Sequence, residues 1–307
     1  MDSAMIVLAG GTGKLGSRIA RAVVERGGNV RAIARRNSGA AGIAALKQLG
    51  VPIVEVDYDD AKCMSAACAG ASCVVSALAG LRQVIVDTQT QLLDAALDAG
   101  VPRFIPSDYC IDFTKLPVGS NRNLDVRREF QWRLDRAPIA ATSILNGMFT
   151  DMLTGQAPIV LFKRKRILYW ENADQPLDFT TIDDTASFTA SAALETSTPR
   201  FLRVAGDRIS ARGLAEAASE VTGEKFKLFR AGGLGRLRTI ARIARTLFPA
   251  SGDLYPPRQG MQYLENMFGG KARLDPLDNR RYGRVHFTSA RDVLGAFVNS
   301  ESVAPVR

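Results

Sequence analysis

The chain has 307 residues, enough to bury one large core or a large and a smaller one, which excludes peptide toxins and disulfide-stapled scaffolds. Hydrophobic residues make up 46% and charged residues 23%, which excludes a disordered or fibrous chain. With 40 Lys and Arg against 31 Asp and Glu, the net charge is +9, a balance that favours acidic ligands such as phosphates. The composition therefore predicts a packed globular protein.

The cysteines and the first residues of the chain indicate whether to expect a metal site and in which compartment the protein works. The four cysteines form no CxxC pair and the chain has one histidine, so zinc and iron–sulfur spacings are absent and we expect no metal site. The apolar run 4–9 follows no basic region and leads directly into a glycine turn, unlike a signal peptide. The uncharged stretch 63–81 contains serines and glycines, so we interpret it as a helix end, a turn and a buried strand rather than a membrane span. We expect a cytoplasmic protein with free thiols and no transmembrane segment.

The first 145 residues alternate short β-branched runs with helical patterns. Strands are expected at 5–9, 29–34, 52–56, 73–76, 103–105 and 140–145, and helices at 14–26, 40–49, 62–69, 83–99 and 123–136. Several of these helices run into a glycine followed by Val or Pro, which marks a helix end and a strand start. Six βα steps in order predict an α/β fold with a doubly wound parallel sheet, the Rossmann arrangement.

Beyond Asn146 the pattern changes. A basic hairpin is expected at 159–170, strands at 177–181, 201–204 and around 285–287, and helices at 211–221, 234–247 and 259–268. We therefore expect one domain over residues 1–150 and a mixed region over 151–307 that completes the sheet and forms a smaller subdomain.

A glycine-rich turn follows the first expected strand and opens a helix. It reads Gly10-Gly11-Thr12-Gly13-Lys14-Leu15-Gly16. Glycines allow a tight turn and a close approach of the backbone to a pyrophosphate, which the N–H groups at the helix N-terminus then bind. The strand before it and the helix after it favour dinucleotide binding over a structural turn.

The end of the second strand bears on the choice of dinucleotide. An acid there would bind the adenosine ribose of NAD, whereas this chain has Arg35 and Arg36, which favours the extra phosphate of NADP(H). One of the two arginines is alternatively a solvated loop residue. Asp57, after the third strand, and its neighbour Tyr58 could reach the adenine edge, or Asp57 is instead a helix N-cap.

Four segments resemble the NmrA-like and isoflavone-reductase-like group of atypical short-chain dehydrogenases/reductases. They are the turn at 10–16 with Arg35 after the second strand, RFIPSDY at 103–109, VRREF at 126–130 and SILNGMF at 143–149. The resemblance implies that NADPH lies across the strand ends, that Pro106 to Tyr109 lie near the nicotinamide, and that Asn146 to Phe149 help wall a substrate cleft. The resulting cofactor residues are Gly10, Thr12, Gly13, Lys14, Leu15, Gly16, Arg35, Arg36, Asp57, Ser76 and Pro106, and the substrate residues are Asp108, Asn146, Met148 and Phe149.

The catalytic residues depart from the family's pattern. The resemblance implies a lysine just before VRREF, whereas this chain has Arg122 and Asn123 there and no lysine between Lys115 and Lys163. Asparagine cannot titrate and arginine is a poor general acid. Tyr109 is the substitute we expect at the nicotinamide side, as a proton donor whose pKa a neighbouring cation would lower, although a tyrosine at a strand end is more often a packing residue. Tyr109 and Asn123 are thus the candidate catalytic positions.

Two functions follow from these expectations. One is an NADPH-dependent oxidoreductase that acts on a small aromatic or conjugated substrate, with residues 1–150 as the NADP-binding domain and 151–307 as the region that forms the substrate subdomain. The alternative is a non-catalytic NADP(H)-sensing regulator, which the absent lysine favours. A homo-oligomer or a regulatory protein partner is open. The basic helix 234–247 is either a solvated surface helix or a contact for an anionic surface, and no nucleic-acid-binding motif accompanies it.

Overall fold

The computed structural model describes residues 4–247, 254, 256–283 and 286–303, which form two compact units. Unit 1 is built from residues 1–109, 123–145 and 182–202, and unit 2 from 110–122, 146–181 and 203–307. The chain passes between the units near the expected boundary at residue 150, but it also does so at several other points.

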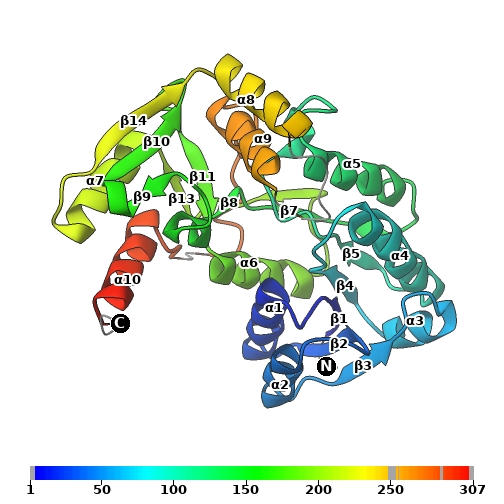
Figure 1. The fold of residues 1–307 in the computed structure, drawn as a ribbon. Coiled ribbons are helices and arrows are strands. Elements are labelled where there is room, and N and C mark those ends of the chain that lie inside the picture. The colour runs from blue at the N-terminus through cyan, green and yellow to red at the C-terminus, as the bar shows by residue number, and fades with distance from the viewer. Residues whose placement is uncertain (1–3, 248–253, 255, 284–285, 304–307) are drawn as a thin grey trace. The chain divides into compact units, whose positions relative to one another are not determined.

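Unit 1 contains a six-stranded parallel sheet with the order β3-β2-β1-β4-β5-β6, as expected for a doubly wound fold (Figure 1). Its strands are β1 (Met5–Ala9), β2 (Asn29–Arg35), β3 (Ile53–Val56), β4 (Cys73–Ser76), β5 (Arg103–Ile105) and β6 (Ala140–Ala141). A two-stranded sheet pairs β7 (Ser143–Leu145) with β12 (Phe201–Arg203). The strand order reverses between β1 and β4, the place where such sheets bind ligands at the carboxyl ends of their strands.

Helices cover both faces of this sheet because its strands are apolar on both sides. The helices are α1 (Lys14–Glu25), α2 (Ala40–Gln48), α3 (Ala61–Cys68), α4 (Gln89–Asp98), α5 (Arg122–Leu134) and α6 (Ile182–Leu194). Along β1, Val7 and Ala9 belong to a core cluster with residues of α3, α4 and α5, whereas the alternate residues face the other side, where α1 packs against α6. Burial of the sheet on both faces explains why its strands are almost continuously apolar in the sequence.

Unit 2 combines two small sheets with helices. The first sheet has the order β14-β10-β9 and the second β13-β11-β8. The strands are β8 (Met148–Phe149), β9 (Val160–Leu161), β10 (Arg166–Trp170), β11 (Leu177–Thr180), β13 (Asp207–Ile209) and β14 (Lys227–Gly232), and the helices are α7 (Ala211–Thr222), α8 (Leu234–Leu247), α9 (Pro257–Phe268) and α10 (Ala290–Val303). Helix α8 packs against α9 and α10 against α7. Short 3-10 turns span Phe113–Lys115, Thr150–Thr154 and Phe162–Arg164.

Several expected elements differ from the structure. The strand expected at 140–145 is divided at Thr142, because the Ser143 N–H donates to the carbonyl of Arg200 and the chain there pairs with β12. The helix expected at 83–99 begins with a π-helical segment, Gln83–Thr88, before α4. Helix α6 was not predicted. Of the strand expected at 285–287, Val285 lies outside the described residues, and His286 and Phe287 are in irregular chain.

Among the described residues, no helix combines the length and the apolar character that a membrane crossing requires.

Candidate functional site

The glycine turn is packed so tightly that two of its glycines have no room for a side chain. A Cβ on Gly10, whose φ is +80°, would lie 2.5 Å from the carbonyl oxygen of Ala77, and a Cβ on Gly16 would lie 2.2 Å from the carbonyl oxygen of Gly10. At Gly13, which has ordinary extended backbone, the same contact is 3.3 Å. The turn therefore needs Gly10 and Gly16 for its own geometry, whereas a Cβ on Gly13 would meet only the Gly10 carbonyl, at a distance that a small shift relieves.

The N-terminus of α1 fits an anionic group. Gly13 is the N-cap of this helix, no side chain caps it, and its first turn carries no acid. Backbone N–H groups at such a terminus lack partners within the helix and carry a partial positive charge. Lys14 is exposed beside it, and Thr12 and Leu15 are half-buried. These residues fit a pyrophosphate as the sequence predicts.

Ser76 ends β4, on the other side of the point where the strand order reverses. Its side chain is fully buried, and its hydroxyl has no hydrogen-bond partner in the part of the chain that the structure describes. A buried hydroxyl without a partner is costly unless a ligand supplies one. Ser76 is therefore consistent with the cofactor contact expected of it.

At the end of β2, Arg35 and Arg36 are both exposed. The guanidinium carbon of Arg35 lies 5.4 Å from the ring centroid of Tyr58, a cation–π contact. Asp57 is exposed, and its carboxylate accepts a hydrogen bond of 3.1 Å from the N–H of Asp59. Asp60, not Asp57, caps the following helix, since its carboxylate accepts from the N–H of Cys63 at 3.0 Å.

The loop after β5 is held by an extensive set of hydrogen bonds. The N–H of Ser107 donates to Gln89 Oε1 at 2.9 Å, and its hydroxyl donates to the carbonyl of Leu78 at 2.6 Å. Arg127 of α5 donates to the Ser107 carbonyl at 3.2 Å. Gln89 is fully buried at the junction of the π-helical segment with α4 and also donates to the carbonyl of Ile85. Sequence reasoning missed these anchors, which fix Pro106 and its neighbours at the carboxyl edge of the sheet.

Asp108 is fully buried in unit 1. Its Oδ2 accepts a 2.6 Å hydrogen bond from the Ser143 hydroxyl, which in turn accepts one of 2.7 Å from Arg200. Burial raises the pKa of Asp108, while the Ser143 hydrogen bond and the charges of Arg127 and Arg200 oppose the rise. In this geometry Asp108 anchors the loop, and the substrate contact expected of it stays a prediction.

The Tyr109 side chain is buried, and its environment differs from the one expected. Burial raises the pKa of its hydroxyl well above the ordinary value, more than the neighbouring Thr189 side chain lowers it. Among the residues that the structure describes, no cation lowers this pKa, so the condition set for Tyr109 from the sequence was wrong. Tyr109 is instead a protonated phenol throughout the neutral range.

Asn123 occupies the position where the resemblance implies a lysine. It is buried in the first turn of α5, and its carbonyl accepts a 2.8 Å hydrogen bond from Arg127. An amide in this place can orient neighbouring groups, but it cannot exchange a proton.

The three other expected substrate residues lie in unit 2. Asn146 is buried and its carbonyl accepts from the Thr180 hydroxyl at 2.7 Å. Gly147 turns the chain with φ of +70°, and Met148 and Phe149 then form β8 beside β11, both half-buried. The structure thus brings these residues together at the start of the second sheet, and their contact with a substrate stays a prediction.

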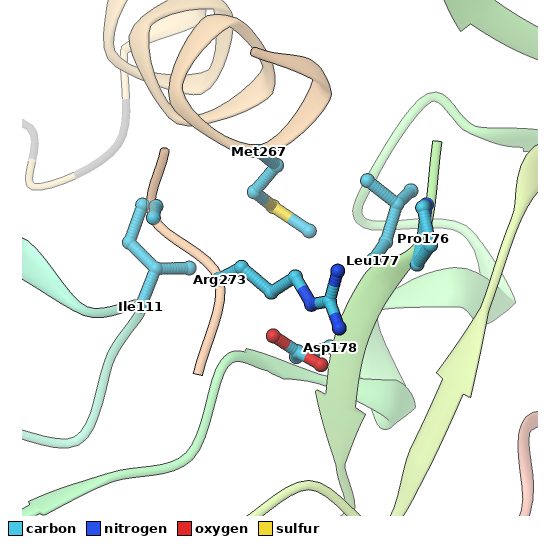
Figure 2. A pocket seen from close by; sticks show the side chains of 7 residues that line it. Ile111, Pro176, Leu177, Asp178, Met267 and Arg273 are labelled. Atoms are coloured by element: carbon cyan, nitrogen blue, oxygen red, sulfur yellow. The ribbon is translucent and has the colours of Figure 1, made fainter. Parts of the chain in front are cut away.

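Unit 2 also contains a small pocket lined by Ile111, Pro176, Leu177, Asp178, Met267, Ala272 and Arg273. Figure 2 shows the Arg273 side chain extending between Met267 and Asp178. The Asp178 carboxylate is already bound by Arg208 at 2.6 Å and by the N–H of Leu274 at 2.7 Å. The volume of the pocket, about 240 Å³ with the solvent-open part included, is below the range usual for ligand sites, and we assign no ligand to the pocket.

Metal chemistry was not expected from the sequence. Within the ranges that the structure describes, no group of three or more His, Cys, Asp and Glu side chains gathers as a metal site would require.

A doubly wound sheet with a glycine turn against a helix N-terminus defines a Rossmann-type protein. The family model described as "NmrA-like family" matches residues 2–278, and the chain belongs to this family. The resemblance inferred from the sequence is thereby confirmed.

The relatives found by sequence include pinoresinol reductase 1 of Arabidopsis thaliana, 26% identical over 204 residues, which are 62% of this chain and 64% of the relative. An isoflavone reductase homolog of Lupinus albus is 23% identical over 244 residues, covering 74% of this chain and 78% of the relative. The match to the Arabidopsis protein thus spans less than two thirds of its length.

Solved structures share the fold. One described as "AtPrR2 with NADP+ and (+)pinoresinol" has a TM-score of 0.83 at 19% identity and covers 97% of this chain and 99% of its own. A leucoanthocyanidin reductase–NADPH complex of Vitis vinifera has a TM-score of 0.80 at 16% identity and covers 96% of this chain and 100% of its own. At these identities the likeness establishes the fold alone.

Proposed function

We propose that the protein is an NADPH-dependent oxidoreductase that reduces a small aromatic or conjugated organic substrate. The observation that carries the proposal lies in unit 1, where the tightly packed turn that begins at Gly10 leads into an uncapped helix N-terminus and Arg35 is exposed at the end of β2. The reductase names of the relatives support the same activity. We propose a cytoplasmic location on the sequence alone.

The residues of unit 1 would divide the work of holding the cofactor. The N–H groups at the start of α1 bind the pyrophosphate, the Ser76 hydroxyl donates to or accepts from a group lying at the end of β4, and Arg35 binds the adenosine phosphate. The loop around Ser107, fixed by Gln89 and Arg127, supports the nicotinamide side. NADPH supplies a hydride when bound.

The source of the proton limits the class of substrate that the protein can reduce. Reduction of an aldehyde or ketone leaves an alkoxide, a base strong enough to take a proton even from a phenol of raised pKa, so Tyr109 is the proposed donor for such substrates. A quinone leaves a much less basic phenolate, which water can protonate without help from the protein. With asparagine at the lysine position, this chain is better suited to quinone-like acceptors than to aldehydes and ketones.

Two measurements test the function. Titration should give NADPH an affinity at least about tenfold higher than NADH, and Arg35→Asp should abolish or reverse that preference because it places a like charge beside the phosphate. NADPH should then be oxidised in the presence of at least one member of a panel of quinones, enones and aromatic aldehydes. Equal affinities would refute the cofactor assignment.

A sensor would bind NADPH yet reduce no member of the panel. Asn123 at the lysine position is compatible with this alternative, whereas the relatives named above are reductases and support the enzyme. NADPH binding without turnover on any of these acceptors would restore it.

A further inference from the structure

The carboxyl ends of β2 and β3 place an arginine against a fixed aromatic ring. The two strands are parallel, with Arg35 opposite Val56 in register, so Arg35 and the residues after Val56 share one edge of the sheet. Tyr58 is two residues beyond Val56, and the guanidinium carbon of Arg35 lies 5.4 Å from its ring centroid.

The ring is the immobile partner of this contact. Tyr58 is 8% exposed and belongs to the same core cluster as Val56, Met64 and Cys68. Burial raises its pKa to about 12, more than the charge of Arg35 lowers it, so the ring stays uncharged. Arg35 is exposed, and a guanidinium lying over a ring keeps its N–H edge available for an anion.

The acidic residues beside this contact have their carboxylates directed elsewhere. Asp57 accepts from the N–H of Asp59, Asp59 accepts from Gln91 of α4 at 2.7 Å, and Asp60 caps α3. Hydrogen bonds to the protein's own groups therefore orient these carboxylates.

The second arginine has a different environment. Arg36 lies near the start of α3, where its charge partly offsets the rise in the pKa of Cys63 that the hydrogen bond and charge of Asp60 cause. In the part of the chain that the structure describes, Arg36 has no stacking partner like that of Arg35. The two arginines, equivalent in the sequence, are therefore not equivalent in the structure.

We propose that Tyr58 is a positioning residue that holds Arg35 in place for the adenosine 2′-phosphate of NADP(H), and that Arg36 does not contribute to this selectivity. The inference rests on the proposed NADPH-binding function and adds to it the residue that sets cofactor preference. Holding a long side chain in its binding geometry before the ligand arrives lowers the entropy lost on binding.

The test compares the affinities of NADPH and NADH by fluorescence titration, with 2′,5′-ADP and AMP as smaller probes that carry and lack the phosphate. Arg35→Ala should lower the NADPH-to-NADH affinity ratio at least about tenfold, whereas the matched control Arg36→Ala should leave it within about twofold. Tyr58→Phe keeps the ring and should keep the ratio. Tyr58→Met, close to it in apolar volume, should lower the ratio about three- to tenfold.

A merely structural role for Tyr58 would weaken both cofactors alike and leave their ratio unchanged, which would overturn the proposal. In an Arg35→Ala background, Tyr58→Met should have no further effect on the ratio, because the residue acts through Arg35. If Tyr58→Met does not fold, the two arginine variants still decide: an equal loss of selectivity in both refutes the assignment. If the wild type prefers NADPH but Arg35→Ala and Tyr58→Met leave the affinity ratio unchanged, this inference alone is refuted. If the wild type binds neither cofactor, the proposed function is refuted as well.

Discussion

Replacing single glycines of the first turn by alanine should separate folding from cofactor binding. A Cβ on Gly16 would lie 2.2 Å from the carbonyl oxygen of Gly10, against ordinary carbon–oxygen contacts of about 3.3 Å, so two backbone segments would have to separate by roughly 1 Å. Overpacking of this kind costs about 1–3 kcal/mol, and alanine's better helix propensity returns about 1 kcal/mol at most.

At Gly13 the corresponding contact of 3.3 Å requires a shift of only a few tenths of an ångström, and the backbone is extended. We expect Gly13→Ala to melt within about 2 °C of the wild type and Gly16→Ala, with a net loss of about 1–2 kcal/mol, to melt about 2–6 °C lower, at roughly 2–3 °C per kcal/mol for a chain of this size. Gly13→Ala should still weaken NADPH at least about tenfold, because its methyl group enters the space reserved for the pyrophosphate.

Thermal melting followed by circular dichroism, and NADPH titration of the same preparations, measure the two effects. Normal NADPH affinity in Gly13→Ala would show that the phosphate does not lie against this turn. Unchanged stability in Gly16→Ala would contradict the close packing on which the argument depends.

Three further outcomes are expected. Arg103→Met should lower the free energy of unfolding by about 2–5 kcal/mol in urea titrations, because the buried guanidinium donates to four acceptors at the end of α6 and beyond it, the carbonyls of Ala192, Ala193 and Glu195 and the Thr198 hydroxyl. The control is Arg26→Met at an exposed arginine, which should cost less than about 1 kcal/mol. Because burial raises the pKa of Asp108 in the folded state, the stability that this carboxyl contributes is full below about pH 4 and is lost as the pH rises through the folded-state pKa. Asp108→Asn should therefore gain melting temperature relative to the wild type as the pH rises through the folded-state pKa. Melting temperatures of the two proteins that run parallel over the pH range would contradict this prediction. Tyr109→Phe should lower turnover of aldehydes and enones by roughly a hundredfold, leaving quinone turnover and NADPH affinity nearly unchanged, and steady-state kinetics on both substrate classes would expose an equal loss if the residue only supports packing.

Local sequence pattern was sufficient to predict the central sheet and its glycine turn. The strands of unit 1 are apolar on both faces and are separated by amphipathic helices, and the glycines at 10–16 can serve few other geometries, so the order of the sheet and the turn were predictable. Two arginines at one strand end are exposed there as a cation site requires, and their contact with an adenosine phosphate stays a prediction.

Long-range contacts account for what the sequence did not predict. Helix α6 is rich in Ala, Ser and Thr and lacks the large periodic apolar residues by which helices are recognised, although Asp183 and Asp184 in its first turn were a usable signal. The pKa of Tyr109 depends on what surrounds its hydroxyl, which neighbouring sequence does not reveal. The same holds for Tyr58, whose contact with Arg35 arises only when two strands pair.

The segment order of unit 1 has a consequence for how the protein is made. Helix α6 packs on α1, and the acceptors of Arg103 lie at 192–198, so the first domain to leave the ribosome lacks one of its covering helices and the partners of a buried cation. The apolar face of α1 therefore stays open while the first segments of unit 2, residues 110–122 and 146–181, are being synthesised. Nascent chains paused between residues 150 and 180 should be clients for chaperones, and a fragment ending there should be prone to aggregate.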